Sequence, residues 1–457
     1  MQDLKHLTEK KRSRFFSGDQ GNRRRSLPVT PFASVEIPTG RGRRRLGYTL
    51  LFLAIVLALT PVSMLIVKKV SPLVPRLAVW YRSASDRTPR PAEAARPPSS
   101  LFENACRLLE NSTADGGRLM AQMPSGDRLE YCIIDGLQQR VRDYLAAHQV
   151  PYGVFVAVEP SSGRILAMTA HSSVDPRWAR TAFFEPYPMA SLFKIVTASA
   201  ALEAGRITPD TVVEFRGKAT SESPRYWEAS PRGRNSRMDV TYAMGKSINP
   251  VYGRIACDIA GKDAVMENVR RFGFNQAILP GVPVKESRAG DPQTSHQLML
   301  MGAGLDHDVK VTPLHAAMIM ASIANGGRMM SPTLVDRVLD GAGGQKEAHV
   351  PRELRQLVSP ATSASLTRML STTVTSGTSR RAFHDRRGRL ILSGVDIAAK
   401  TGSINGDDPK GHYSWFAAYA PARAPRIALA ALVINQDKWR IKASQVGEKA
   451  LEEFFRD

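Results

Sequence analysis

The sequence predicts a mixed α/β (α+β) protein whose antiparallel sheet combines strands from both ends of the folded region. Helices should flank this sheet, with an all-helical lobe inserted between the two groups of strands. Alternating apolar runs typical of strands occur before residue 170 and after residue 395, whereas residues 191–390 are mostly helical in composition. A third observation, an uncharged apolar run ahead of the folded region, predicts an N-terminal transmembrane helix.

The strand predictions rest on a change of hydrophobic period. Two β-rich runs, 154–159 and 164–169, are separated by Pro160-Ser161-Ser162-Gly163, a turn sequence that indicates an antiparallel hairpin. Near the C-terminus the strand period returns. The strands predicted there cover residues 396–403, 413–420 and 426–435.

The helices are predicted from apolar residues at helical spacing and from Gly- or Pro-marked ends. An amphipathic C-terminal helix over 443–455 should cover one face of the sheet, and the inserted lobe should pack on the other. The remaining predicted helices span residues 101–110, 135–148, 191–204, 240–260, 264–272, 312–324 and 361–374.

The N-terminal region predicts a membrane anchor. Residues 46–67 form a run of 22 residues without a charge, and at about 1.5 Å per residue such a helix spans a hydrocarbon core of roughly 30 Å. The long basic lead favours an uncleaved signal-anchor with a cytoplasmic N-terminus. We therefore divide the chain into a basic disordered arm (1–45), the anchor (46–67), a Pro-rich linker (68–100), a short extension (101–134) and a main folded domain (135–457).

The formal charge of +21 is concentrated at the N-terminus. Residues 1–45 hold twelve Lys or Arg against four acidic residues, a net charge of +8, which leaves +13 for the remainder. Few aromatic residues, such as Phe15 and Phe16, are interleaved with the basic ones. Attraction to anionic lipid head groups explains the arm better than nucleic-acid binding, so no nucleic-acid partner is expected.

Cysteine and histidine usage argues against a metal centre. Three cysteines in an exported domain permit one disulfide, and Cys106 with Cys132 is the natural pair by proximity. Three free thiols, Cys257 included, are nearly as consistent with the sequence. No cysteine–histidine spacing suggests zinc, and we expect neither a metal nor another cofactor.

Ser191 and Lys194 are the first candidate catalytic residues. Three positions apart on a helix, their side chains share one face, so a lysine of depressed pKa could take the serine proton. A Ser-x-x-Lys tetrad arises by chance about once in a chain of this length, so its context matters. Here the apolar helix begins at the serine, where free backbone N–H groups and the helix dipole favour developing negative charge.

Two further motifs complete the pattern. Ser-x-Asn occurs twice, as Ser247-Ile248-Asn249 and Ser403-Ile404-Asn405, and we favour the first because it lies in the predicted helical lobe. Lys400-Thr401-Gly402 occurs once, within a predicted strand, and is the most specific of the three. The predicted sheet places this strand beside the start of the Ser191 helix.

The ordered set of motifs resembles the transpeptidase domain of penicillin-binding proteins, within the serine β-lactamase and D,D-peptidase superfamily. The resemblance covers about residues 135–457 and agrees with the predicted sheet and helical lobe. Longer stretches that carry it include Val311-Thr-Pro-Leu-His-Ala-Ala-Met, Ile323-Ala-Asn-Gly-Gly, Ser376-Gly-Thr378 and Tyr413-Ser-Trp-Phe-Ala-Ala-Tyr-Ala. Met189-Ala190, where the family often has Pro-Gly, and Pro250 are small departures.

The resemblance implies a role for each motif residue. Ser191 is the acylated nucleophile, Lys194 its general base and Ser247 a proton shuttle toward the leaving amine. Lys400 keeps the site electropositive, and the backbone N–H groups of Ser191 and Ser403 form the oxyanion hole. The implied substrate-binding residues are Asn249, on the acyl side, and the strand residues Thr401, Gly402 and Ser403, with the Thr401 and Ser403 hydroxyls meeting the terminal carboxylate.

The resemblance also implies a function. A membrane-anchored peptidoglycan D,D-transpeptidase would cross-link stem peptides through a serine acyl-enzyme and bind β-lactam antibiotics covalently. It would work outside the bacterial cytoplasmic membrane, and a glycosyltransferase or a division or elongation protein stays open as a partner. The alternatives are a D,D-carboxypeptidase, a serine β-lactamase or a non-enzymatic sensor. No obvious glutamate-bearing loop is present to activate a deacylating water, which disfavours the β-lactamase.

Overall fold

The computed structural model describes residues 100–279 and 281–456. The predicted basic arm, transmembrane anchor and nearly all of the Pro-rich linker lie outside these residues. Within the described part of the chain, no helix combines the length and the apolar character needed to cross a membrane.

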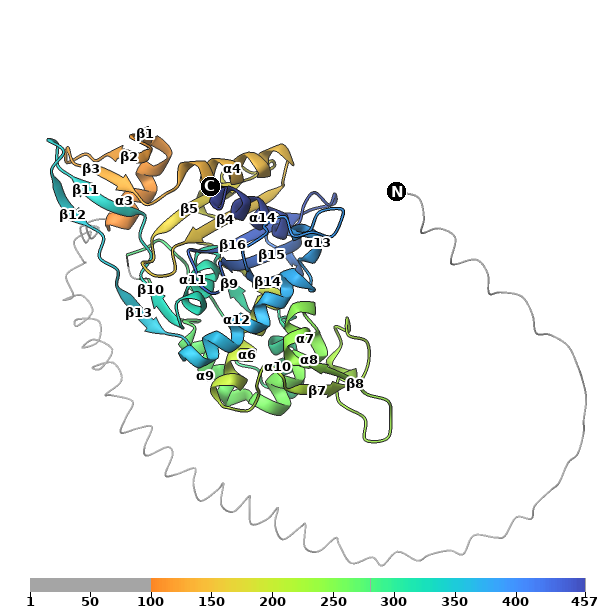
Figure 1. Ribbon diagram of the computed structural model, residues 1–457. Coiled ribbons are helices and arrows are strands. Elements are labelled where there is room, and N and C mark those ends of the chain that lie inside the picture. Colours follow the sequence, from red (N-terminus) through yellow and green to blue (C-terminus); the bar gives the residue numbers. More distant parts are fainter. Residues whose placement is uncertain (1–99, 280, 457) are drawn as a thin grey trace, which may run out of the picture. The chain divides into compact units, whose positions relative to one another are not determined.

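A five-stranded antiparallel sheet organises the fold and joins segments from both ends of the folded region, as expected from the sequence (Figure 1). Every residue of the central strand is buried, which explains its nearly continuous apolar sequence. In spatial order the strands are β14 (Ala398–Asp407), β15 (Lys410–Ala420), β16 (Ile427–Asn435), β4 (Tyr152–Val158) and β5 (Ile165–His171).

Each face of the sheet has its own hydrophobic core. Val154, Val156 and Val158 face one core, whereas Phe155 and Ala157 face the other, as the two-residue period of a strand requires. Helices from distant parts of the sequence cover these faces. They are α11 (Pro313–Ala324) on the first face, and α4 (Asp135–Ala147) and α14 (Ala443–Phe454) on the second.

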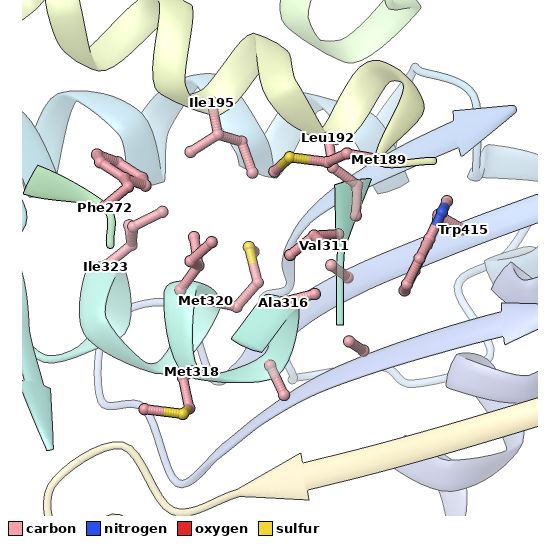
Figure 2. Close-up of a cluster of buried hydrophobic side chains, with 14 of the residues drawn as sticks. Met189, Leu192, Ile195, Phe272, Val311, Ala316, Met318, Met320, Ile323 and Trp415 are labelled. Atoms are coloured by element: carbon pink, nitrogen blue, oxygen red, sulfur yellow. The ribbon is translucent and has the colours of Figure 1, made fainter. Parts of the chain in front are cut away.

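The first core connects the sheet to the helix that carries the catalytic motif. Figure 2 shows Leu192 and Ile195 facing the α11 side chains, with Trp415 of the sheet beside them. Met318 lies on the opposite side of α11 from Met320. Because α11 is apolar on all sides, it is buried between the sheet and the helical lobe.

The inserted lobe is mainly helical, but the expectation that it is all-helical is wrong. Two-stranded ladders, β7–β8 and β10–β13, lie within it. The predicted helix over 240–260 is also interrupted, because Ser247 adopts a left-handed conformation and ends its first part. The helices are α6 (Lys194–Glu203), α7 (Val240–Lys246), α8 (Asn249–Arg254), the π-helix η4 (Ile255–Ala260), α9 (Lys262–Arg271), α10 (Ser295–Ala303) and α12 (Pro360–Thr375), and the strands are β7 (Val212–Phe215), β8 (Ser236–Asp239), β10 (Arg328–Met330) and β13 (Glu353–Gln356).

Residues 101–134 pair with a segment much later in the chain. Their strands form a second five-stranded sheet in which β3 pairs with β11, and Arg337 of β11 donates to the buried Glu130 of β3 at 2.8 Å. In spatial order this sheet contains β1 (Thr113–Asp115), β2 (Arg118–Gln122), β3 (Arg128–Tyr131), β11 (Val335–Leu339) and β12 (Gln345–Ala348). Preceding it are α3 (Leu101–Leu108) and η1 (Leu109–Asn111). Other short elements are α5 (Trp178–Thr181), β6 (Tyr187–Pro188), η3 (Pro224–Tyr226), β9 (Lys310–Val311) and α13 (Arg380–Phe383).

The three cysteines are free, so the expected Cys106–Cys132 disulfide is absent and the alternative holds. Burial raises the pKa of both the Cys106 and the Cys132 thiol to about 12. These thiols therefore remain protonated and unreactive at neutral pH.

Candidate active site

Ser191 lies in a short 3₁₀ turn, η2 (Ala190–Phe193), that leads directly into α6. The preceding Ala190 has a φ of 53°, a left-handed conformation that costs energy for any residue with a Cβ atom. The departure noted in the sequence, alanine where the family often has glycine, therefore falls on a strained position. This turn holds Ser191 at the entrance of the helix with 9% of its surface exposed.

Lys194 is fully buried and its ammonium nitrogen contacts the serine directly. Its Nζ donates to Ser191 Oγ at 2.7 Å and to Asn249 Oδ1 at 2.8 Å, and also to the carbonyl oxygen of Ala303. Burial, and secondarily repulsion from Lys400, hold the pKa of Lys194 well below its usual value. A lysine in this state can be neutral and accept the serine proton.

Ser247 and Lys400 form a second hydrogen-bonded pair in the site. Lys400 Nζ donates to Ser247 Oγ at 2.8 Å and to the Thr401 carbonyl at 2.8 Å. Ser247 has a φ of 58° at the C-terminal end of α7, which is the kind of strained backbone found at functional sites. Burial lowers the pKa of Lys400 to about 7.

Asn249 connects Lys194 to the loop between β7 and β8. Its Oδ1 accepts from Lys194, and its Nδ2 donates to the Ser221 carbonyl at 3.2 Å. Pro250, the second departure noted in the sequence, lies in the first turn of α8, where a backbone N–H has no helical partner to lose. It therefore does not disturb the geometry of Asn249.

The strand β14 borders the site as an edge strand of the main sheet. At Gly402 it passes so close to the η2 turn that an added Cβ would lie 3.1 Å from Ala190 Cβ and 3.3 Å from the Met189 carbonyl oxygen. A side chain here would separate the strand from the serine. Thr401 Oγ1 forms a 2.6 Å hydrogen bond with Thr378 Oγ1, and Ser403 is exposed beside them.

The predicted site residues gather around one cavity of about 350 Å³. Ser191, Ser247, Asn249 and the strand residues 401–403 line it, whereas Lys194 and Lys400 are buried. The structure thus brings all eight predicted residues together. The second Ser-x-Asn motif does not supply the asparagine, because Asn405 lies outside the residues that line the cavity and its Oδ1 contacts His412 Nδ1 at 3.0 Å.

Three contributors to the site were not assigned a role from the sequence. A backbone carbonyl such as that of Ala303 has no sequence signal at all. Thr378 occurs in the Ser376-Gly-Thr378 stretch that supported the resemblance, but the stretch alone does not show that its hydroxyl meets Thr401. Glu222 also lines the cavity and had no recognisable motif around it.

The geometry is that of an acyl-transferring serine site, and the comparisons with known proteins agree. Residues 153–457 match the family described as "Penicillin binding protein transpeptidase domain". The chain belongs to this family. Among its relatives, peptidoglycan D,D-transpeptidase PbpA of Mycobacterium tuberculosis is 32% identical over 349 residues, which are 68% of this chain and 68% of the relative.

Solved structures of penicillin-binding proteins share the fold. The crystal structure of PBPA from Mycobacterium tuberculosis has a TM-score of 0.59 and 28% identity, covering 71% of this chain and 81% of that one. The imipenem acyl-enzyme complex of penicillin-binding protein A from the same organism has a TM-score of 0.60 and 28% identity, covering 71% and 79%. The mixed α/β fold with antiparallel sheets is therefore that of the penicillin-binding proteins.

Gly304 packs against the η2 turn and provides a test of this penicillin-binding site. Its φ is 70°, and an added Cβ would lie 2.3 Å from the Ala190 carbonyl oxygen and 2.8 Å from Ser191 Cα. Gly304→Ala should displace Ser191 and slow covalent labelling by a fluorescent penicillin on the order of 100-fold. The labelling rate constant and the thermal unfolding midpoint measure the effect.

Gly290→Ala is the matched control, because an added Cβ there would have no atom within 4 Å. It should leave labelling unchanged. Wild-type labelling by Gly304→Ala would show that the close approach of Gly304 does not position the serine.

Proposed function

We propose that this chain is a serine D,D-transpeptidase that forms an acyl-enzyme at Ser191 and cross-links peptidoglycan stem peptides. One observation carries the proposal: a fully buried lysine of lowered pKa donates to the serine hydroxyl at 2.7 Å, in a site bordered by the Lys400-Thr401-Gly402 strand. Family membership and the named D,D-transpeptidase relative support the choice of substrate.

In the proposed acylation step, Ser191 Oγ attacks the carbonyl carbon of a D-Ala-D-Ala peptide bond while Lys194 takes its proton. The bond to the terminal D-Ala nitrogen breaks, and the proton passes through Ser247 to this leaving amine. Lys400, which contacts Ser247 Oγ, orients the shuttle. The backbone N–H groups of Ser191 and Ser403 stabilise the oxyanion, and one such donor contributes on the order of 3 kcal/mol.

Substrate binding follows from the same geometry. The hydroxyls of Thr401 and Ser403 hold the terminal carboxylate, and Thr378 fixes the orientation of Thr401 through its 2.6 Å hydrogen bond. Asn249 holds the acyl side and, through Lys194, keeps the base in place. Penicillins acylate the same serine because they present a reactive amide and a carboxylate at matching positions.

Mass spectrometry of products from a synthetic stem peptide ending in D-Ala-D-Ala tests the proposal. With an amine acceptor present, the enzyme should release D-Ala and form an amide between the two peptides. Release of D-Ala with hydrolysed peptide as the sole product would instead assign a D,D-carboxypeptidase. Rapid turnover of penicillin would assign a β-lactamase, and failure to acylate at all would leave a non-enzymatic role.

We further propose that residues 46–67 anchor the chain in the bacterial cytoplasmic membrane, with the catalytic domain outside the cytoplasm. The uncharged run and its basic lead support this topology. The full chain should fractionate with membranes and its catalytic domain should be digested by protease added to spheroplasts. Recovery of the full chain in the soluble fraction would contradict the anchor.

A further inference from the structure

The cavity that contains Ser191 is lined by one carboxylate among the described residues, that of Glu222. This side chain is exposed and has no hydrogen-bond or ion-pair partner within residues 100–279 and 281–456. Two lysines, Lys246 and Lys442, also line the cavity. The chemistry assigned above to Ser191 and Lys194 does not use Glu222.

The backbone beside Glu222 is held firmly against the catalytic residues. The preceding Ser221 accepts from Asn249 Nδ2 at 3.2 Å through its carbonyl and from Trp227 Nε1 at 3.0 Å through its hydroxyl. Trp227 is fully buried in a cluster with Met299 and Ala303. The Ala303 carbonyl also accepts from Lys194. The cluster of Trp227, Met299 and Ala303 therefore contacts both the Glu222 loop and Lys194.

The charges of the cavity are divided between its two walls. Lys442 stands on the sheet side, because the next residue, Ala443, donates its N–H to Ser414 Oγ at 3.2 Å and Ser414 pairs with Ser403 on β14. Glu222 stands on the side of the helical lobe, because the carbonyl of the preceding Ser221 accepts from Asn249 Nδ2. A donor peptide held by Asn249 and Ser403 does not need Glu222, whose carboxylate therefore remains available to a second molecule.

The second substrate of the proposed transpeptidase reaction carries a primary amine, which is a cation in water. We propose that Glu222 binds the side-chain ammonium of the acceptor peptide at the mouth of the cavity. Lys246, the cation on the same side, has its Nζ 5.8 Å from the centre of the Tyr242 ring, a cation–π contact that directs it toward that ring. The inference rests on the proposed function and extends it to the acceptor.

Glu222 acts in this scheme before the chemical step. The ammonium docks against the carboxylate and then loses one proton to water. The neutral amine attacks the carbonyl carbon of the Ser191 ester, a C–N bond forms and the C–Oγ bond breaks. The second amine proton passes to Ser191 Oγ, so Glu222 is an acceptor-binding residue that leaves the reacting atoms to Ser191 and Lys194.

Glu222→Gln tests the inference, with Glu228→Gln as the matched control. Glu228 is an exposed glutamate of the same loop that does not line the cavity. The enzyme is acylated with a D-Ala-D-Ala peptide, and the ratio of amide product to hydrolysed product is measured with Nα-acetyl-lysine amide as acceptor. Hydroxylamine, which is uncharged at neutral pH, serves as the second acceptor.

Glu222→Gln should lower the ratio for the lysine acceptor about two- to fivefold at low salt, as expected for an exposed charge pair. The difference should shrink at high salt and be absent with hydroxylamine. Glu228→Gln should match the wild type, and all three proteins should label equally fast with penicillin.

Two results would overturn the inference while leaving the proposed function intact. One is an unchanged ratio in Glu222→Gln, although the wild type forms amide product. The other is slower release of the penicillin adduct in Glu222→Gln, which would make the carboxylate an activator of water. If the wild type formed no amide with either acceptor, the transpeptidase proposal itself would fail and the inference with it.

Discussion

Replacing Ser191 by alanine should abolish covalent labelling by a fluorescent penicillin, with a loss of at least about 10⁴-fold in the acylation rate. The hydroxyl is the atom that forms the ester, and the neighbouring Lys194 cannot substitute for it while it is held by Asn249 and the Ala303 carbonyl. Labelling followed by gel fluorescence and by intact-protein mass spectrometry measures the effect.

Ser199→Ala is the matched control for this experiment. Ser199 lies on α6, the helix that follows Ser191, and is fully buried; its hydroxyl donates to the Ile195 carbonyl at 2.8 Å instead of lining the cavity. This variant should label at the wild-type rate. Equal labelling of Ser191→Ala and wild type would refute the assignment of the nucleophile.

Replacing Lys194 by methionine should reduce acylation by about 10²- to 10⁴-fold, the range expected for loss of a general base. Methionine keeps much of the side-chain volume, and the buried position should tolerate it without loss of the fold. The rate constant for acylation, measured by stopped-flow with a chromogenic β-lactam across pH, gives both the size of the loss and its pH dependence.

The wild-type pH profile follows from the direction of the Lys194 pKa shift. A lysine accepts a proton only when neutral, that is, above its pKa, and burial with Lys400 nearby lowers that pKa well below 10.5. The acylation rate should therefore rise with pH through a midpoint well below 10.5. This rise should be missing in Lys194→Met.

Lys400→Met separates the two causes of that shift. Removing the Lys400 charge removes the repulsion, so the pKa of Lys194 should increase and the midpoint of the profile should move to higher pH. The rate itself should also fall, because Ser247 loses its hydrogen bond from Lys400. An unchanged midpoint would show that burial alone sets the basicity of Lys194.

Much of the architecture could be predicted from the sequence. The hairpin, the three C-terminal strands and the helix after them have strong local periods, and each was found within a few residues of its predicted bounds. The second sheet was not predicted, because β3 pairs with β11 about two hundred residues later and neither strand has a distinctive pattern. The helix break at Ser247 was missed because a serine, unlike a glycine, does not indicate a positive φ in the sequence.

The candidate site shows the same division. Ser191 and Lys194 were recognisable because their spacing on a helix is a local property, and Lys400-Thr401-Gly402 because it is a rare triplet in a strand. Of the two Ser-x-Asn motifs, the first was favoured from its place in the predicted helical lobe, and the fold agrees: Ser247 contacts Lys400, whereas Asn405 contacts His412. The position of Glu222 in the cavity could not be predicted either, because it depends on how Trp227 packs the Glu222 loop against the helical lobe.

By itself, the sequence determined which chemical groups are available and which of them share a helix face or a strand. Only the tertiary structure decided their state: Lys194 can act as a base because burial and the nearby Lys400 lower its pKa. The physical reason is that a pKa depends on burial and on nearby charges, and these come from segments more than fifty residues away. The position of Glu222, the proposed acceptor-binding residue, arises in the same way, from packing between distant segments.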